Sequence, residues 1–319
     1  MYLVPHLISE HRIHPPIGDV GHNYMAITPV INDWYLARQT TRIDTGSIVA
    51  CQLKPFGDDF RMVNMFDVLT PELDPFDDQG RKVDNYEDQT PFLPNRLFKG
   101  SKLCMVTSQV TRKASQEGLR CSIAKTDLNP NLTRGSATRT MGSPEQLSEQ
   151  FLLPEGSFLK ELECLKLING EPWHIAEGDD NGHSCLCIVK MSENGITDAK
   201  MLLTAPQVGA EHLSTGSHAI SLGQDDLYLV FINRRINAVW SGTYLILKIN
   251  KSGVTVEYIP EHNIIEAKCG SGEGPQGQTV AFISAAFQLK GGELELYYHL
   301  NDMYSIIVRM MLVRKYRQF

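Results

Sequence analysis

Two stretches near the C-terminus decide the fold: SHAISLGQDDLYLVF (217–231) with GTYLILKINKSG (242–253), and AFISAAFQLKGGELELYYH (281–299) with YSIIVRMMLV (304–313). Each contains an apolar run, a turn carrying Gly, Asn or Asp, an aromatic-rich second run and a third run. Short runs rich in Val, Ile, Leu, Tyr and Phe between such turns are typical of antiparallel strands. The two stretches therefore predict one structural unit that occurs twice.

The spacing of this unit predicts the architecture. The copies begin at Ser217 and Ala281, 64 residues apart, so a chain of 319 residues holds about five of them. Weaker copies begin at His22, Glu87 and Glu161. We therefore predict an all-β protein folded as a five-bladed β-propeller, with one domain over residues 1–319. A short helix is predicted at 143–154, because Ser143 can cap its N-terminus and Pro144 suits the first helical position.

Composition narrows the function classes. With a net charge of -7 and a single basic cluster at the C-terminus, the chain offers no basic surface for nucleic acid. No apolar run is long enough for a membrane span and no leader pattern opens the chain, so we expect a cytoplasmic protein without a membrane partner. The seven cysteines are odd in number and lie mostly in apolar runs, which is typical of reduced core thiols. The oligomeric state stays open.

Polar residues at the starts of apolar strands are the candidate site. A propeller brings the innermost strand of every blade to one central channel, so residues far apart in sequence can meet there. Because an unpaired buried charge is costly, a charged or imidazole side chain at such a position needs a reason. These residues are His22 in the first unit, Glu87 and Asp88 in the second, Lys160, Glu161 and Glu163 in the third, His218 in the fourth and Ser284 in the fifth.

The order of these features resembles the mannoside phosphorylases and related mannosidases, a group of glycosidase-like five-bladed propellers. The resemblance extends over most of the chain, including GLRCSIAKTDLNP (118–130) and AFISAAFQLKGGELELYYHLND (281–302). Asn85-Tyr86-Glu87-Asp88 stands where the family carries Gly-x-Glu-Asp-Pro-Arg, whose Asp is the catalytic acid. The resemblance thus implies that Asp88 is an acid and that the substrate is a small or oligomeric sugar, such as a β-mannoside. Gln89-Thr90 replaces the family's Pro-Arg, so one cation that would bind phosphate or sugar is absent here.

Glycoside chemistry would use these residues in distinct roles. Asp88 would protonate the leaving oxygen, and Glu163 or Glu161 would act as the base. Hydrolysis and phosphorolysis both remain open, with inorganic phosphate as the co-substrate in the second case. The candidate substrate-binding residues are Glu87, Arg120, Lys160, His218, Trp240 and His299.

Two alternatives stay open at this level. His22 and His218, with one or two of Asp88, Glu161 and Glu163, form a mixed imidazole and carboxylate set that suits a divalent metal. Such a site would support a lyase, cyclase or isomerase acting on a small metabolite. Alternatively, the channel is filled by a polar network and the loops bind sugar without catalysis.

Overall fold

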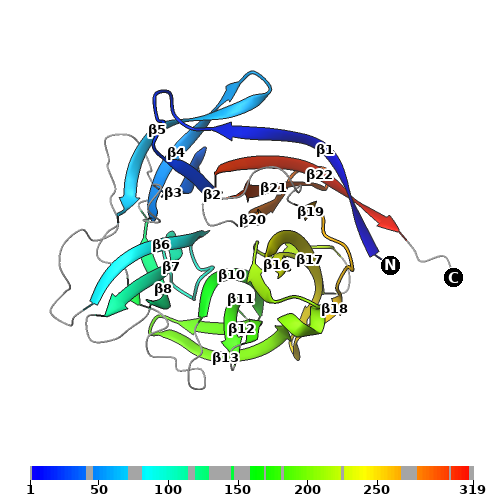
Figure 1. Cartoon of the computed structure of the whole chain (residues 1–319). Coiled ribbons are helices and arrows are strands. Elements are labelled where there is room, and N and C mark those ends of the chain that lie inside the picture. The colour runs from blue at the N-terminus through cyan, green and yellow to red at the C-terminus, as the bar shows by residue number, and fades with distance from the viewer. Residues whose placement is uncertain are drawn as a thin grey trace.

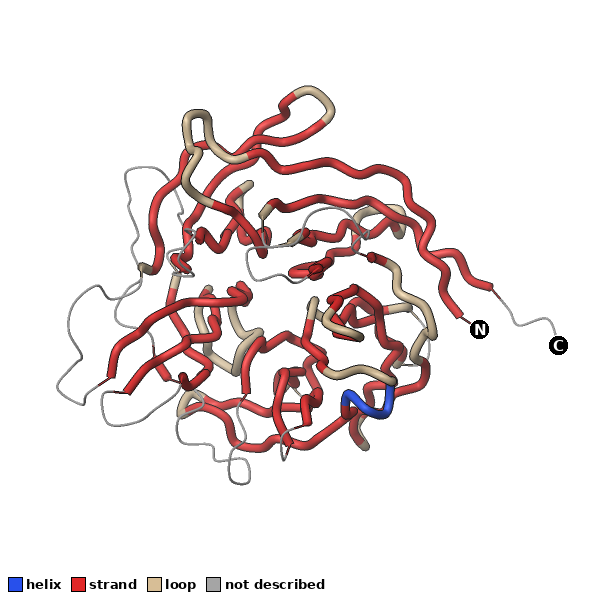
Figure 2. The backbone as a smooth tube through the Cα atoms, viewed as in Figure 1, coloured by secondary structure: helices blue, strands red, loops and turns tan. Residues whose placement is uncertain are grey.

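The computed structural model describes residues 2–40, 46–70, 81–113, 119–128, 145–146, 159–168, 170–180, 183–223, 226–266, 279–301 and 303–315. In these residues the chain is built from β-strands, and the single helical element is the short 3-10 helix η1 (Ala205–Val208) (Figure 2). No helix in these ranges has the length and apolar character that a membrane crossing requires. The prediction of an all-β protein is therefore confirmed.

Antiparallel groups of strands follow one another along the chain and surround a common centre (Figure 1). The first group is β2 (Asn23–Ile31), β3 (Trp34–Thr40), β4 (Gly46–Phe56) and β5 (Asp59–Leu69). The second is β6 (Arg81–Phe92), β7 (Cys104–Lys113), β8 (Leu119–Asp127) and β9 (Glu145–Gln146). The third is β10 (Leu159–Ile168), β11 (Glu171–Asp180), β12 (His183–Ser192) and β13 (Gly195–Thr204).

The remaining strands complete the circle. One group contains β14 (His212–Thr215), β15 (Ile220–Ser221), β16 (Leu227–Ile236), β17 (Val239–Asn250), β18 (Gly253–Tyr258) and β19 (Ile265–Glu266). The last contains β20 (Thr279–Gln288), β21 (Glu293–Leu300), β22 (Tyr304–Lys315) and the N-terminal strand β1 (Tyr2–His14). β1 pairs antiparallel with β22 along most of its length, from Tyr2↔Lys315 to Ile13↔Ser305. The two ends of the chain therefore close the last group together.

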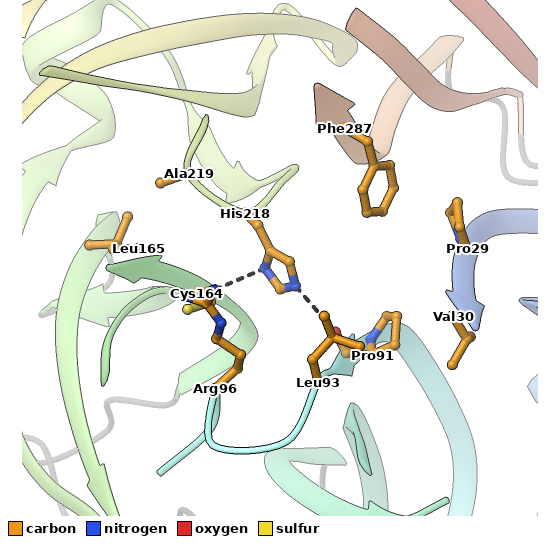
Figure 3. Close-up of a pocket in the computed structure, with 10 residues that line it drawn as sticks. All are labelled: Pro29, Val30, Pro91, Leu93, Arg96, Cys164, Leu165, His218, Ala219 and Phe287. Atoms are coloured by element: carbon orange, nitrogen blue, oxygen red, sulfur yellow. Dashed lines mark hydrogen bonds between the residues drawn. The ribbon is translucent and has the colours of Figure 1, made fainter. Parts of the chain in front are cut away.

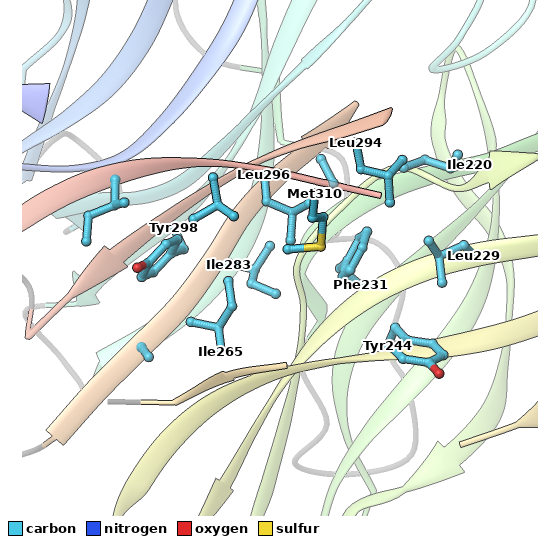
Figure 4. Packing of buried hydrophobic residues seen from close by; sticks show 14 of the residues in the cluster. Ile220, Leu229, Phe231, Tyr244, Ile265, Ile283, Leu294, Leu296, Tyr298 and Met310 are labelled. Carbon is cyan, nitrogen blue, oxygen red and sulfur yellow. The ribbon is translucent and has the colours of Figure 1, made fainter. Parts of the chain in front are cut away.

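Apolar clusters lie between neighbouring groups of strands. They explain why the strand sequences are almost continuously apolar. Figure 4 shows one of them, in which Phe231 and Tyr244 of β16 and β17 pack with Ile283 and Leu296 of β20 and β21. Comparable clusters join the other neighbours. Because both faces of a sheet are covered, the strands bury apolar area on each side, which contributes roughly 25 cal/mol per Å².

The described residues bear on two further expectations. The cysteines whose side chains are described are free and buried, as expected for reduced core thiols; they are Cys51, Cys104, Cys164, Cys185 and Cys187. Most of the helix predicted over 143–154 lies outside the described residues. Its two described residues, Glu145 and Gln146, are not helical: they form β9, because they pair with Lys125 and Ala124 of β8.

Candidate active site

The innermost strands enclose a narrow central cavity. Its lining comes from β2, β6, β10, β14 and β20, and its volume is about 20 Å³. That is room for roughly one water molecule, so a sugar ring does not fit inside it. The lining residues are Ala26, Gln89, Thr90, Glu161, Glu163, Thr215, Phe282, Ile283 and Ser284. The predicted convergence of Glu161, Glu163 and Ser284 is therefore observed in the described residues.

The same irregularity recurs in three of these inner strands. In β10 the register passes from Lys160↔Glu177 to Glu163↔Ile175, so the inner strand carries one extra residue. β2 and β6 carry the same bulge, between Met25 and Thr28 and between Glu87 and Thr90. A bulge of this kind re-aims side chains and is common beside active sites. Ala26, Asp88 and Glu161 occupy the corresponding first position of the three bulges.

Glu161 is held in an unusual backbone conformation. Its φ is 54°, in the left-handed region, which costs a non-glycine residue about 1–2 kcal/mol. Its backbone N–H donates to Ser108 Oγ at 3.0 Å, and its carbonyl accepts a hydrogen bond from Thr215 Oγ1 at 2.6 Å. These bonds from two neighbouring groups stabilise the strained residue. Strain that the surroundings enforce in this way is typical of functional positions.

The Glu161 carboxylate belongs to a buried polar set that we call the amino-end cluster, defined as Lys160, Glu161, Glu177, His212 and Ser214. Ser214 Oγ donates to Glu161 Oε2, and Lys160 Nζ lies 3.4 Å from both Glu161 Oε1 and Glu177 Oε1. Glu177 is fully buried and its Oε1 lies 2.7 Å from His212 Nε2. Burial, together with the positive charges of Lys160 and Arg235, lowers the pKa of His212 to about 4. His212 is therefore neutral at pH 7, and one ammonium lies between two carboxylates.

A row of aromatic rings extends from this cluster. His212 contacts Trp240 edge to face at 5.2 Å, and Trp240 contacts Phe282 in the same manner at 5.4 Å. Phe282 then stacks on His299 at 5.3 Å. Trp240 is half-buried, so part of its indole is open to a ligand. We call these four residues, His212, Trp240, Phe282 and His299, the aromatic row. Two of the sequence candidates, Trp240 and His299, belong to it. A third, Lys160, is connected to it through Glu177, which contacts both Lys160 and His212.

Glu163 faces the opposite way along the channel. Its Oε1 accepts a hydrogen bond from Thr90 Oγ1 at 2.9 Å, and its Oε2 lies 2.5 Å from His218 Nδ1. His218 Nε2 donates to the Pro91 carbonyl at 3.2 Å, and the Cys164 backbone nitrogen lies 3.0 Å from Nδ1 (Figure 3). Burial disfavours the charged imidazole, but the charge and hydrogen bond of Glu163 outweigh it and raise the pKa of His218.

His218 lines a second and larger cavity of about 300 Å³, which we call the carboxyl-end pocket (Figure 3). On β2, β6 and β10 its lining residues follow those of the central cavity: Pro29 follows Ala26, Pro91 follows Thr90, and Cys164 follows Glu163. In contrast, Lys160 and His212 precede the cavity residues of their strands. The amino-end cluster and the carboxyl-end pocket therefore lie at opposite ends of the inner strands.

Three sequence candidates have backbone positions but no described side chains. Glu87 and Asp88 lie at the bulge of β6, which lines the channel. Arg120 lies on β8, separated from β6 by β7, so its backbone is about 10 Å from the innermost strand. The assignment of Arg120 to the channel stays a prediction.

The metal alternative finds no support among the described side chains. His22 precedes β2 and is exposed, and its Nδ1 lies 2.9 Å from Asp19 Oδ1 in the same turn. It does not line the central cavity, whereas His218 pairs with Glu163. In the described ranges, no three His, Cys, Asp or Glu side chains gather as metal ligands. Each imidazole has a different local partner, Asp19 for His22 and Glu163 for His218, so the shared metal site stays a prediction.

Sequence reasoning missed Glu177, His212, Ser214 and Thr90. Glu177 lies on the second strand of its group, whereas the sequence expectation covers only the innermost strands. His212 and Ser214 precede Ser217, where the sequence repeat begins, because the innermost strand of this group starts several residues before the repeat. Glu177 could have been noticed as an acidic residue directly after the apolar run WHIA.

Comparison with solved structures shows the fold. A β-1,2-mannobiose phosphorylase from Listeria innocua, solved with β-1,2-mannobiose, aligns with a TM-score of 0.63 and 12% identity over 95% of this chain and 97% of its own. A mannose phosphorylase from Leishmania mexicana, solved with phosphate, aligns with a TM-score of 0.56 and 12% identity over 96% of this chain and 89% of its own. An endo-arabinase from Bacteroides thetaiotaomicron aligns with a TM-score of 0.54 and 11% identity over 96% of this chain and 99% of its own.

No protein-family model matches the chain, and no curated protein matches it in sequence. At these identities the structural matches establish a shared architecture and no more. The predicted resemblance to the mannoside phosphorylase fold, a propeller-type all-β fold, is confirmed in this sense.

Proposed function

We propose that the chain is a five-bladed propeller enzyme that cleaves a glycosidic bond at the amino-terminal ends of its inner strands. The observation that carries this proposal is the shared bulge of β6 and β10, which gives Asp88 and Glu161 corresponding positions on neighbouring inner strands. Glycoside cleavage requires two carboxyl groups in different environments. Similarity of fold to phosphorolytic and hydrolytic enzymes adds support.

The blade count rests on the inner strands. Strands β2, β6, β10, β14 and β20 line the central cavity, and each begins an antiparallel group. Parallel contacts join groups at two places, between β1 and β5 and between β17 and β20. Five groups around one cavity correspond to five blades, the last closed by β1.

The roles follow from the contacts. Asp88 is the general acid, and Glu161 is the ionised second carboxylate, because Lys160 and Ser214 both favour its charged form. Glu163 is engaged by Thr90 and His218 and is a structural residue. Hydrolysis suits the site better than phosphorolysis, since Thr90, which stands in place of the family's Arg, supplies no positive charge and its hydroxyl donates to Glu163.

The substrate has to lie outside the central cavity, which holds about one water. The aromatic row offers half-buried Trp240, with Arg235 over its ring at 5.8 Å, beside the amino-end cluster. Sugar rings pack their apolar faces on such rings. The sugar therefore lies on Trp240, with Lys160 near its hydroxyls.

The test is a panel of β-mannosides and α-arabinosides incubated with the purified chain, with and without phosphate, followed by chromatography of the products. Asp88→Asn should lose at least about a hundredfold of the activity, because a general acid contributes 10²–10⁴-fold. Asp198→Asn, an exposed carboxylate on β13, is the matched control and should keep full activity. Full activity of Asp88→Asn would exclude the assigned acid.

A non-catalytic sugar-binding propeller is the second candidate. It is favoured by the small central cavity and by the full set of partners around Glu161 and Glu163. Under this alternative, calorimetry detects sugar binding while no product forms, and Asp88→Asn binds as well as the natural chain does. Product formation at any rate above the Asp88→Asn background would exclude it.

A further inference from the structure

The carboxyl-end pocket has no part in the function proposed above. It lies at the end of the inner strands opposite the amino-end cluster, and its volume of about 300 Å³ is of the size of small-molecule sites. Figure 3 shows that its walls come from different groups, with Pro29 and Val30 facing Leu165 across the space. A cavity of this size with walls from separate blades is pre-formed for a ligand.

The walls are mainly apolar. Val30, Leu93, Leu165 and Phe287 contribute aliphatic and aromatic surface, and the Phe287 ring faces the interior of the pocket (Figure 3). The polar lining side chains are limited to Arg96, His218 and the Cys164 thiol. A sugar placed here would lose water from its hydroxyls without gaining partners, which is costly. The walls therefore favour a ligand with an apolar body.

The charge of the pocket is positive. Arg96 lies in the loop after β6, and no carboxylate pairs with it in the part of the chain that the structure describes. Its positive charge acts on both neighbours, since it opposes protonation of His218 and lowers the pKa of the Cys164 thiol against the larger effect of burial. Both ring nitrogens of His218 already have protein partners, and its charge is balanced by Glu163, so Arg96 supplies the positive charge and the donors for a ligand.

An arginine with free donors above an apolar cavity recognises one kind of ligand. Its planar guanidinium presents two parallel N–H groups that match the two oxygens of a carboxylate. A phosphate or sulfate would leave the apolar walls unfilled and would carry a larger charge than one guanidinium neutralises. We propose that the carboxyl-end pocket binds a small monocarboxylate with an apolar body, whose carboxylate lies on Arg96 and whose body packs against Leu165 and Phe287.

The experiment is calorimetric titration of the full chain with 3-phenylpropionate as the probe, alongside its neutral amide and acetate. The acid should bind at least about tenfold more tightly than the amide, because a charge-assisted pair contributes roughly that factor. It should also bind at least about tenfold more tightly than acetate, which lacks the apolar body. Equal binding of acid and amide would overturn the assignment, as would no binding of the acid up to 10 mM (an order-of-magnitude limit for a weak ligand).

Variants locate the site. Arg96→Gln should weaken acid binding about tenfold and leave amide binding unchanged. This side chain is exposed, and the printed hydrogen bonds of Arg96 come from its backbone, to His174 and to the Leu93 carbonyl, so the variant should keep the fold. Lys99→Gln, in the same loop and outside the lining, is the charge-matched control and should bind normally.

If Phe287→Ala binds the acid as tightly as the natural chain, the apolar body of the ligand does not lie in this pocket and the proposal fails. Glycosidase activity is not needed for any of these readouts, so the two proposals fail separately.

Discussion

The two ends of the inner strands differ in chemistry although the same strands build both. At the amino end, Lys160, Glu177 and His212 form a charged and hydrogen-bonded cluster. At the carboxyl end, Val30 and Phe287 belong to an apolar pocket. β10 shows how one strand serves both, since the bulge separates Glu161, held by Lys160 and Ser214, from Glu163, held by Thr90 and His218. The two carboxylates of this strand thus have different partners, and our proposal assigns chemistry to Glu161 and structure to Glu163.

The largest expected effect distinguishes these two glutamates by activity. Glu161→Gln should reduce kcat on the best glycoside by about 10²–10⁴-fold, because it removes the ionised second carboxylate. Glu163→Gln should retain more than about a tenth of the activity. Initial rates of product release measure both variants. If Glu163→Gln proved the more damaging of the two, the assignment of chemistry to the amino end would be wrong.

Stability should depend far more on the buried partner of His218 than on an exposed ion pair. Glu163→Ala removes the partner of a largely buried imidazole, and breaking a buried pair costs about 3–5 kcal/mol. Because His218 keeps 30% of its side chain exposed, we expect about 3 kcal/mol, the lower end of that range. Urea unfolding measures the loss. Asp226→Asn removes the charge of the exposed pair with Lys166, keeps a residue type suited to the left-handed φ of 58°, and should cost less than about 1 kcal/mol.

The two ends should also respond oppositely to pH. The folded pKa of His212 is lowered to about 4, so between that value and 6.5 the unfolded chain binds more protons and stability falls as pH falls. From pH 7 to 5 this costs about 2 kcal/mol. Fully buried His174, whose pKa is also lowered to about 4, acts in the same direction.

His218 has a raised folded pKa, so its contribution is complete below 6.5 and is lost as pH rises through the folded value. The urea concentration at the unfolding midpoint, measured across pH 5–8, reports the contribution of the amino end in His212→Gln and of the carboxyl end in His218→Gln. His212→Gln should flatten the acid side of the profile, and His218→Gln the alkaline side. An unchanged acid side in His212→Gln would contradict the assigned shift.

The smallest effect concerns the aromatic row. Trp240→Leu should raise KM by about 2–10-fold with little change in kcat, since an aromatic contact contributes about 0.5–1.5 kcal/mol. Trp173→Leu is the matched control, because Trp173 packs beneath Lys190 away from the channel. A larger loss in the control than in Trp240→Leu would place the sugar elsewhere.

Local pattern was enough for the strands, because each needs only a short apolar run and a turn. SHAISLGQDDLYLVF and AFISAAFQLKGGELELYYH form β15, β16, β20 and β21 as expected. The repeat was also enough to predict that Glu161, Glu163 and Ser284 line one cavity, because equivalent residues of repeated units occupy equivalent positions in the fold. The site partners were not accessible in this way. Glu177 and His212 meet across two groups of strands, and no local pattern reports such a meeting.

The sequence by itself determined an all-β chain of repeated antiparallel units with polar residues at the inner strand starts, because hydrophobic periodicity and turn chemistry act over a few residues. The tertiary structure alone decided the rest. A bulge in β10 divides Glu161 from Glu163, His22 turns to Asp19, and His218 turns to Glu163. The physical reason is that each buried charge takes whichever partner the neighbouring strands bring within hydrogen-bond distance, and that choice depends on register and packing between segments far apart in sequence.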